Sequence, residues 1–421
     1  MKSTFIFPLM LLLVTALTLR TIHKSWFSPG AFFPLLWFFF TIFPIIFAIE
    51  YPTPVFGIWV ITAFSISIGV GSLLAVPGNN VWSNSSMLNT HSITEYSKTV
   101  QWGTAVTSFL SLIGIFFLIR YTIMKFQMDY SFFSFLALPN QISAERYNEL
   151  LVYPLFLKFL LYWLSPAALF AGVGFALATT KKQYLLYFSP LFIAVIKGAL
   201  ETTRSTILIA LVLWLAGYAG ARVAQQDNLK HLFDKKSFLF VSVAGIVFVF
   251  LFVSLQWLRE AGGNFVVELL MERIKLYFFG YLSAFSLWVS SVHNVDVTLG
   301  MTTFAGPFSF IGLIDRDLGF YDSTTIIYGL TSTNVYTALR GIINDFTIIG
   351  SLVFGIGIGF GATMAFQKSL QGYIFWLVPL TMFYAFTLYA PLISIFHYNS
   401  VIASWVIVFS TFFLIPRPAA E

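Results

Sequence analysis

Eleven apolar stretches, each long enough or nearly long enough to cross a membrane as a helix, follow one another along the chain. A helix needs about 20 mostly apolar residues to cross the hydrocarbon core, and in lipid a helix pairs all of its own backbone polar groups. The pattern therefore predicts an all-α, polytopic integral membrane protein with 11–12 transmembrane helices, folded as a single domain over residues 1–421. The stretches are 4–19, 31–49, 55–76, 103–120, 151–178, 184–200, 205–221, 238–256, 341–366, 373–390 and 398–415.

The composition excludes several classes of protein. Only 10% of the 421 residues are charged and 58% are hydrophobic, whereas a soluble domain carries about 25% charged residues. A cytosolic enzyme, a nucleic-acid-binding protein and a disordered chain are therefore excluded. The sequence has no cysteine, which removes disulfides, thiol nucleophiles and thiolate zinc sites. We attribute the net charge of +6 to basic residues in cytoplasmic loops and expect no nucleic-acid partner.

The placement of lysine and arginine predicts the orientation of the C-terminal part of the chain. Putting basic positions such as Lys181–Lys182 and Lys368 in the cytoplasm is self-consistent from residue 181 onward. It makes the segment 257–340 a large extracytoplasmic loop and places the junction 201–204 near the outer face. Within this loop, the apolar stretch Tyr277–Val289 is short for a span and predicts an interfacial or re-entrant helix. Loops of this length are often functional; the alternative is a passive cap.

The N-terminal half is less consistent. The polar stretch 77–100 reads as external, and the basic stretch 120–150 reads as internal. The segment 151–178 must then start and end on the cytoplasmic side, although it is too short for two crossings. Either Pro154 and Pro166 break a re-entrant or amphipathic helix pair, or one assignment is wrong.

The sharpest local feature is the charged group Lys197, Glu201 and Arg204. On one helix these residues would share a face at i, i+4 and i+7. Charges at this depth need partners or a wet cavity, and the planar donor fork of arginine suits phosphate oxygens. We expect a cationic clamp on a lipid-linked phosphate; the alternative is a self-satisfied group of ion pairs that fixes a helix end.

A second polar cluster lies where the large loop returns to the membrane. Hydroxyl and amide groups beside an aromatic ring suit a sugar, which needs hydrogen-bond partners and a face to stack on. The alternative is a polar helix start with ordinary capping. The glycines that follow predict close helix packing and not a nucleotide loop, because they lie inside an apolar span. The cluster is Asn334, Tyr336, Arg340, Asn344 and Asp345, and the glycines are Gly355, Gly357, Gly359 and Gly361.

Other chemical signals are weaker. Asp315 and Asp317 resemble the acidic pair with which glycosyltransferases hold a divalent metal, but a solvated turn is the default, and we predict no metal and no cofactor. His293 and His397 are isolated in sequence, and either could act as a base near neutral pH; the default for each is a structural role. No nucleotide-binding loop or hydrolase motif is present.

The run from Glu201 to Ser205, which follows a Lys-Lys turn, is similar to the Gly-Ser-Arg-Ser junction of bacterial oligosaccharide repeat-unit polymerases, the Wzy-type O-antigen polymerases. The stretch Asp345–Gly350 resembles the Asp-Phe-Gly-x-x-Gly helix start of the same family. Two departures are visible: Thr347 stands where glycine is usual, and Glu201 stands at a position often small or polar. The resemblance covers roughly residues 180–415.

The resemblance implies a membrane glycosyltransferase of GT-C-like architecture in the bacterial inner membrane, with its active site facing the periplasm. Its substrates would be oligosaccharides linked to undecaprenyl pyrophosphate. Its partners would be the membrane lipid and a chain-length regulator protein. The growing glycan is transferred onto a new repeat unit to build O-antigen or a related surface polysaccharide. Arg204 matches the family arginine and would stabilise the departing pyrophosphate. Its expected helpers are Arg340 and Arg259, and the candidate bases are Asp345, Glu201, His293 and His397.

Two rival functions remain. An O-antigen ligase-like transferase shares the chemistry, but ligases typically carry a histidine after the large loop, and the stretch 334–345 has none. A lipid-linked oligosaccharide flippase or transporter would typically show a repeated half and charges at mid-membrane depth; we find no repeat.

Overall fold

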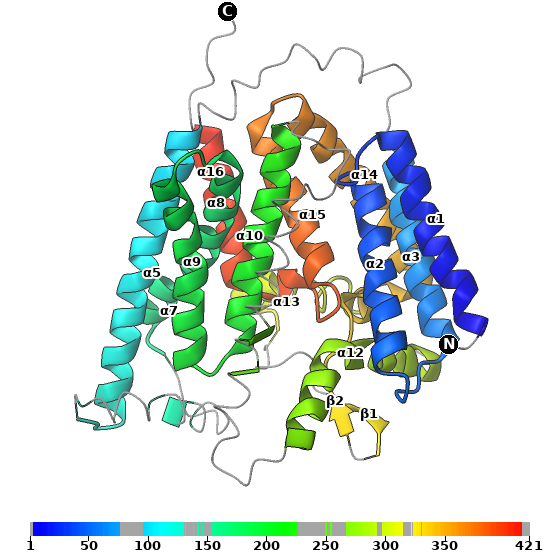
Figure 1. Cartoon of the computed structure of the whole chain (residues 1–421), viewed down its shortest axis with the longest axis horizontal. Coiled ribbons are helices and arrows are strands. Elements are labelled where there is room, and N and C mark those ends of the chain that lie inside the picture. The colour runs from blue at the N-terminus through cyan, green and yellow to red at the C-terminus, as the bar shows by residue number, and fades with distance from the viewer. Residues whose placement is uncertain are drawn as a thin grey trace, which may run out of the picture. The chain divides into compact units, whose positions relative to one another are not determined.

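The computed structural model consists mostly of helices (Figure 1). By its internal contacts the chain divides into two compact units. Unit 1 comprises Met1–Ile93, Arg222–Leu232 and Met271–Ile402, and unit 2 comprises Thr94–Ala221, Phe233–Leu270 and Ala403–Glu421. The structure describes residues 3–75, 96–129, 131, 138, 141–142, 145, 153–225, 249–250, 253–254, 267–292, 297–314, 321, 323–329 and 331–414.

Unit 1 contains three N-terminal helices, most of the segment 257–340 and the helices that follow this segment. Its elements are η1 (Ser3–Phe5), α1 (Ile6–His23), α2 (Pro29–Phe47), α3 (Val55–Leu74), α12 (Val267–Ser291), α13 (Ala305–Phe310), β1 (Thr325–Tyr328), β2 (Thr331–Thr333), α14 (Ala338–Leu370), η3 (Ile374–Trp376), α15 (Leu377–Tyr389) and η4 (Ile395–His397). Unit 2 contains α5 (Ser97–Lys125), α7 (Leu155–Tyr162), α8 (Leu164–Leu177), α9 (Lys181–Leu200), most of α10 (Arg204–Ala224) and most of α16 (Asn399–Leu414).

The membrane character of the sequence is confirmed. Eight helices in the described part of the chain are long and apolar enough to cross a membrane, with α7 and α8 counted together, and two shorter apolar helices follow near the C-terminus. Ten of the eleven predicted stretches therefore form helices. The remaining stretch, 238–256, lies almost entirely outside the described residues.

The segment 257–340 contains strands as well as helices, which the all-α prediction missed. β1 and β2 pair antiparallel, with Thr325 opposite Thr333 and Ile326 opposite Ser332. The predicted helix Tyr277–Val289 lies inside the longer helix α12. In Figure 1, α12 lies beside the two strands, at the end of unit 1 where α2 and α3 are connected.

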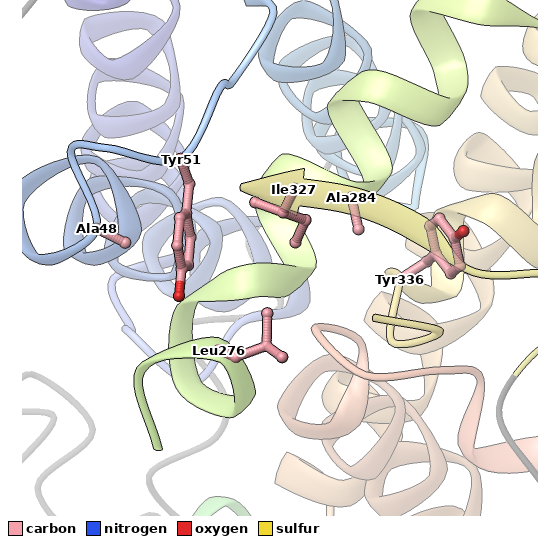
Figure 2. Close-up of a cluster of buried hydrophobic side chains, with 6 residues drawn as sticks. All are labelled: Ala48, Tyr51, Leu276, Ala284, Ile327 and Tyr336. Atoms are coloured by element: carbon pink, nitrogen blue, oxygen red, sulfur yellow. The ribbon is translucent and has the colours of Figure 1, made fainter. Parts of the chain in front are cut away.

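A buried cluster joins α12 to both neighbours within unit 1. Figure 2 shows Leu276 and Ala284 of α12 between Tyr51, from the α2–α3 connection, and Tyr336, from the segment after β2. Polar contacts reinforce this packing: the Tyr281 hydroxyl donates to the carbonyl oxygen of Phe40 at 2.5 Å. Lys275 and Glu50, which are both partly exposed, form an ion pair across the same boundary. The cluster thereby fixes the segment after β2 to the ends of α2 and α3.

Close packing of α3 against α14 depends on two glycines of α14. A Cβ at Gly355 would overlap the Ser67 hydroxyl, and one at Gly359 would overlap the carbonyl oxygen of Ile68. Small residues four apart allow such backbone approach between membrane helices, so the packing role is confirmed for Gly355 and Gly359. It is wrong for Gly357 and Gly361, because nothing in the described residues lies within 4 Å of a Cβ at either position.

The helices α7 and α8 of the segment 151–178 follow one another in one direction and form one candidate span, so of the two alternatives the wrong assignment of a side holds and not the re-entrant pair. The ring of Phe156 on α7 contacts Phe117 on α5, a Cβ at Gly114 would meet Leu160, and one at Gly103 would meet Phe170 on α8. As residue numbers increase along α7 and α8, the residue numbers of their contacts on α5 decrease. The helices α7 and α8 therefore run antiparallel to α5. Since the end of α8 packs on the start of α9 through Phe175 and Tyr184, Lys181–Lys182 lie at the opposite end of unit 2 from Lys125.

Unit 1 corrects the predicted sidedness independently. The Gln367 side chain donates to the carbonyl oxygen of Ala75 at 3.2 Å, so the stretch 77–100 begins at the Lys368 end of this unit. An external 77–100 and a cytoplasmic Lys368 are therefore incompatible. Keeping the lysines cytoplasmic reverses both N-terminal predictions: the stretch 77–100 starts on the cytoplasmic side, and α5 ends, at Lys125, on the outer side.

Cysteine labelling tests this sidedness, and the chain has no native cysteine to remove. Single cysteines at the exposed positions Lys24 and Tyr373 should react with a membrane-impermeant maleimide from the same side, and Ile49→Cys from the other. In unit 2, Lys182→Cys and Asp129→Cys should react from opposite sides. Labelling of Lys182→Cys and Asp129→Cys from one side would contradict the single crossing of α7 and α8.

Two alanine substitutions on α14 form a matched pair. Gly359→Ala should destabilise the protein by about 1–3 kcal/mol, because the added methyl group overpacks against Ile68. Gly357→Ala should stabilise it by up to about 1 kcal/mol, since alanine favours a helix interior over glycine and open space surrounds this position. Thermal unfolding in detergent measures both; equal effects would contradict the assignment of the packed face.

Candidate functional site

The junction between α9, which ends at Leu200, and α10, which begins at Arg204, is a tight turn. The N–H of Thr203 donates to the carbonyl oxygen of Gly198 at 2.8 Å, and that of Thr202 to Ala199 at 3.4 Å. This pair of bonds is the Schellman motif, which requires a left-handed residue that is usually glycine. Thr202 takes that place with φ of +50°. The turn therefore holds a β-branched residue in a backbone conformation that favours glycine.

The charged residues of this junction are divided between two helices. Because α9 ends at Leu200, Arg204 does not share a helical face with the other two residues, and the predicted i, i+4, i+7 arrangement is wrong. Lys197 and Glu201 form an ion pair of 3.1 Å, in which both side chains are largely buried, and the Thr203 hydroxyl donates to the same carboxylate at 3.4 Å. The turn thus holds a paired acid in place.

Arg204 is the first residue of α10 and is half-buried. The first turn of a helix presents N–H groups without intrahelical partners and carries the positive end of the helix dipole. An arginine at this position adds a planar donor group, so the start of α10 is chemically suited to a phosphate oxygen.

In unit 1, Arg340 occupies the first turn of α14 inside a cage of three aromatic rings. The guanidinium carbon lies 3.9 Å from the ring centre of Tyr336, 4.3 Å from that of Tyr321 and 5.1 Å from that of Trp288. Cations are attracted to ring faces within about 6 Å. Trp288 and Tyr321 come from distant parts of the chain, and no local pattern marks them among 50 phenylalanines, 19 tyrosines and 11 tryptophans.

The hydrogen bonds of Arg340 are incomplete. Its Nη2 donates to the Ser323 hydroxyl at 2.6 Å, whereas Nε and Nη1 are buried and have no hydrogen-bond partner in the described residues. The side chain is 8% exposed. Burial raises the pKa of the Tyr321 phenol although Arg340 opposes this effect, so the phenol stays neutral and supplies no counter-charge.

The neighbouring predicted sugar contacts have other partners. Tyr336 is 1% exposed, and its hydroxyl bonds with that of Thr325 at 2.6 Å. Since its ring is buried and contacts Arg340, it contributes through that arginine and not as an open stacking face. Asn334 and Asn344 are half-buried on either side of Arg340 in sequence.

The Asp345 carboxylate is fully buried and accepts three hydrogen bonds. Its donors are the N–H of Thr302 at 2.9 Å, the N–H of Thr303 at 2.7 Å and the Thr298 hydroxyl. These bonds occupy the oxygens that a base would use. Asp345 therefore anchors the turn before α13 to α14.

The helix α14 is interrupted immediately afterwards, at Thr347. This residue has φ of +64° and ψ of 176°, a region that is essentially restricted to glycine. Its hydroxyl accepts the N–H of Gly350 at 3.4 Å, as an N-cap does. α14 is thus two helical pieces, and the second begins with its own cap.

The remaining predicted residues do not extend either cluster. His397 is largely buried in η4, whose backbone packs on Gly306 of α13. Arg259, His293, Asp315 and Asp317 lie outside the described residues. Within the described part of the chain, no group of three histidine, aspartate or glutamate residues is arranged to hold a metal ion.

No family model, curated protein or solved structure matches this chain.

Replacing Thr347 by glycine should stabilise the protein. Relief of the backbone strain should raise the free energy of unfolding by about 1–3 kcal/mol. The greater flexibility of glycine in the unfolded chain should lower it by about 0.5–1 kcal/mol. Thr18→Gly, at an exposed position of the regular helix α1, is the control and should destabilise by a few tenths of a kcal/mol, because threonine is itself a weak helix former. Thermal unfolding of both variants in detergent decides; loss of stability in Thr347→Gly would show that position 347 is not strained.

Proposed function

We propose that this chain is a membrane glycosyltransferase that polymerises oligosaccharide repeat units carried on undecaprenyl pyrophosphate. The observation that carries the proposal is the junction before α10. Arg204 begins a helix there, two residues after the left-handed Thr202, at the end of α9 opposite Lys181–Lys182. An anion-suited helix start on the side away from the lysines fits a lipid pyrophosphate at the outer face.

The backbone at two motif positions supports the resemblance to repeat-unit polymerases. The Gly-Ser-Arg-Ser pattern, aligned on Arg204, places glycine at position 202, and the Asp-Phe-Gly-x-x-Gly pattern, aligned on Asp345, places it at position 347. Both positions hold threonine with positive φ, +50° and +64° respectively. Glycine is the residue that takes such conformations without strain, so the backbone at both positions suits the glycine of the motif although threonine stands there.

In the proposed reaction, a hydroxyl oxygen of the new repeat unit attacks the anomeric carbon of the growing glycan. The bond from that carbon to the pyrophosphate breaks, and the pyrophosphate leaves with the electron pair. Arg204 stabilises the negative charge that develops on it. A base takes the hydroxyl proton. The candidates remain Asp345, Glu201, His293 and His397, of which Asp345 and Glu201 engage their carboxylates with other groups in the structure.

A lipid-linked oligosaccharide flippase or secondary transporter is the second candidate. The observation in its favour is the break of α14 at Thr347, since transporters use discontinuous helices whose half-helix ends face the substrate. The ligase-like transferase gains no separate support.

A size ladder of products tests the polymerase. Purified protein in detergent, given its lipid-pyrophosphate-linked repeat unit, should produce multiples of that unit with or without EDTA. Arg204→Ala should lower the rate at least about 10²-fold, because it removes a fixed group that stabilises the developing charge. Arg204→Lys should retain part of the activity, since it keeps the charge without the planar fork.

Lys182→Ala is the matched control, because it removes one positive charge from the exposed opposite end of α9; it should leave the ladder unchanged. An activity loss in Arg204→Ala that only follows a lower yield of folded protein would contradict the role of Arg204. The absence of any ladder with the cognate substrate would favour the ligase or the flippase.

A further inference from the structure

Arg340 carries a buried charge whose partner is missing from the described residues. The side chain is 8% exposed, and no described carboxylate forms an ion pair with it. A buried charge is strongly unfavourable unless it is paired and hydrogen-bonded. The other buried ionic groups described above meet this requirement: Glu201 has Lys197, and Asp345 has three donors. Arg340 differs from both, because neither a counter-charge nor a full set of hydrogen-bond partners surrounds it in the described residues.

The aromatic cage positions the guanidinium but does not neutralise it. Tyr336, Tyr321 and Trp288 surround it at 3.9–5.1 Å, and all three side chains are uncharged. The rings are themselves held: Tyr321 packs edge-on against Tyr336, and Tyr336 belongs to the buried cluster with α12. Such a cage holds a planar cation at a fixed place and leaves its N–H groups for an acceptor.

Two donor nitrogens of Arg340 have no acceptor in the described part of the chain. One edge of the aromatic cage lies near solvent. Nε and Nη1 have no hydrogen-bond partner in the described part of the chain. Nη2 bonds to Ser323, which is exposed. A carboxylate or a phosphate supplies several acceptor oxygens and a negative charge, and arginine pairs with both groups in the same plane.

We propose that Arg340 and its cage of Trp288, Tyr321 and Tyr336 form an anion-recognition site that binds a carboxylate or phosphate group of a ligand. The site lies at the start of α14, the opposite end of that helix from Lys368. It goes beyond the proposed polymerase, because it follows from the unpaired donors of Arg340 alone and would select an anionic ligand in any reaction.

Thermal unfolding of the full chain in detergent tests the site. Sodium glucuronate and inorganic phosphate are the two anionic probes; glucose and sodium chloride of equal ionic strength are their controls. We expect one of the two anions to raise the Tm in a saturable way, glucuronate identifying a carboxylate site and phosphate a phosphate site. Arg340→Gln should weaken that apparent affinity at least tenfold, the effect of losing a charge-assisted hydrogen bond.

Lys275→Gln is the matched control, because it also removes one positive charge from unit 1 but from a lysine paired with Glu50; it should keep the affinity of the wild-type protein. If Arg340→Gln does not fold, the wild-type protein can still test the site. The anion that raises the Tm should slow the modification of Arg340 by phenylglyoxal, as monitored by peptide mass spectrometry.

Three results would overturn the proposal. The first is a Tm that neither anion raises beyond the chloride control. The second is an Arg340→Gln variant that binds like the wild-type protein. The third is an Asp322→Asn variant that loses as much stability as Arg340→Gln while no anion acts, since the partner would then belong to the chain. None of these results bears on polymerisation, which is measured through Arg204.

Discussion

In a membrane, every backbone N–H and C=O must find a partner within the protein, and this constraint accounts for the places where helices of this chain end or break. Between α9 and α10, the Schellman turn pairs the last N–H groups with the carbonyl oxygens of Gly198 and Ala199. At Thr347, the break in α14 is capped by the threonine hydroxyl. Directly before it, the carbonyl oxygens of Asn344 and Asp345 accept N–H groups of Thr298 and Leu299. Each interruption is therefore paired with local hydrogen bonds.

Buried ionic groups meet the same constraint in three different ways. Glu201 is paired with Lys197 on the previous turn of its helix. Asp345 has no such cation and relies on two backbone N–H groups and a hydroxyl. Arg340 is surrounded by rings and has one hydroxyl acceptor. The first two are satisfied without a ligand and thus serve the fold, whereas the third keeps unused donors, which is why it bears on binding.

Hydrophobic patterning shows where the helices of this chain lie but not which of their faces are packed. Patterning located ten helices, because a span must be apolar over its full length whatever it packs against. It placed Gly355 and Gly357 together as packing residues, although only Gly355 meets a neighbour. Residues two apart face different sides of a helix, and nothing in the sequence states which side α3 covers. Charge counting likewise misplaced the stretch 77–100, because its flanks carry too few basic residues to fix a side.

The sequence alone determined that this chain is a bundle of membrane helices, since a composition with 10% charged residues cannot cover a water-facing surface. It also marked the charges of Lys197, Glu201 and Arg204 as ones that need partners beside apolar stretches, and Arg340 as a member of a polar cluster where the chain returns to the membrane. Only the tertiary structure decided what surrounds them. It divided the Lys197–Arg204 group between two helices, and it brought Trp288 and Tyr321 to Arg340 from positions 52 and 19 residues earlier in the chain. The physical reason is that cation–ring contacts act between side chains at a few ångströms, so they depend on how helices and loops fold back and not on local sequence.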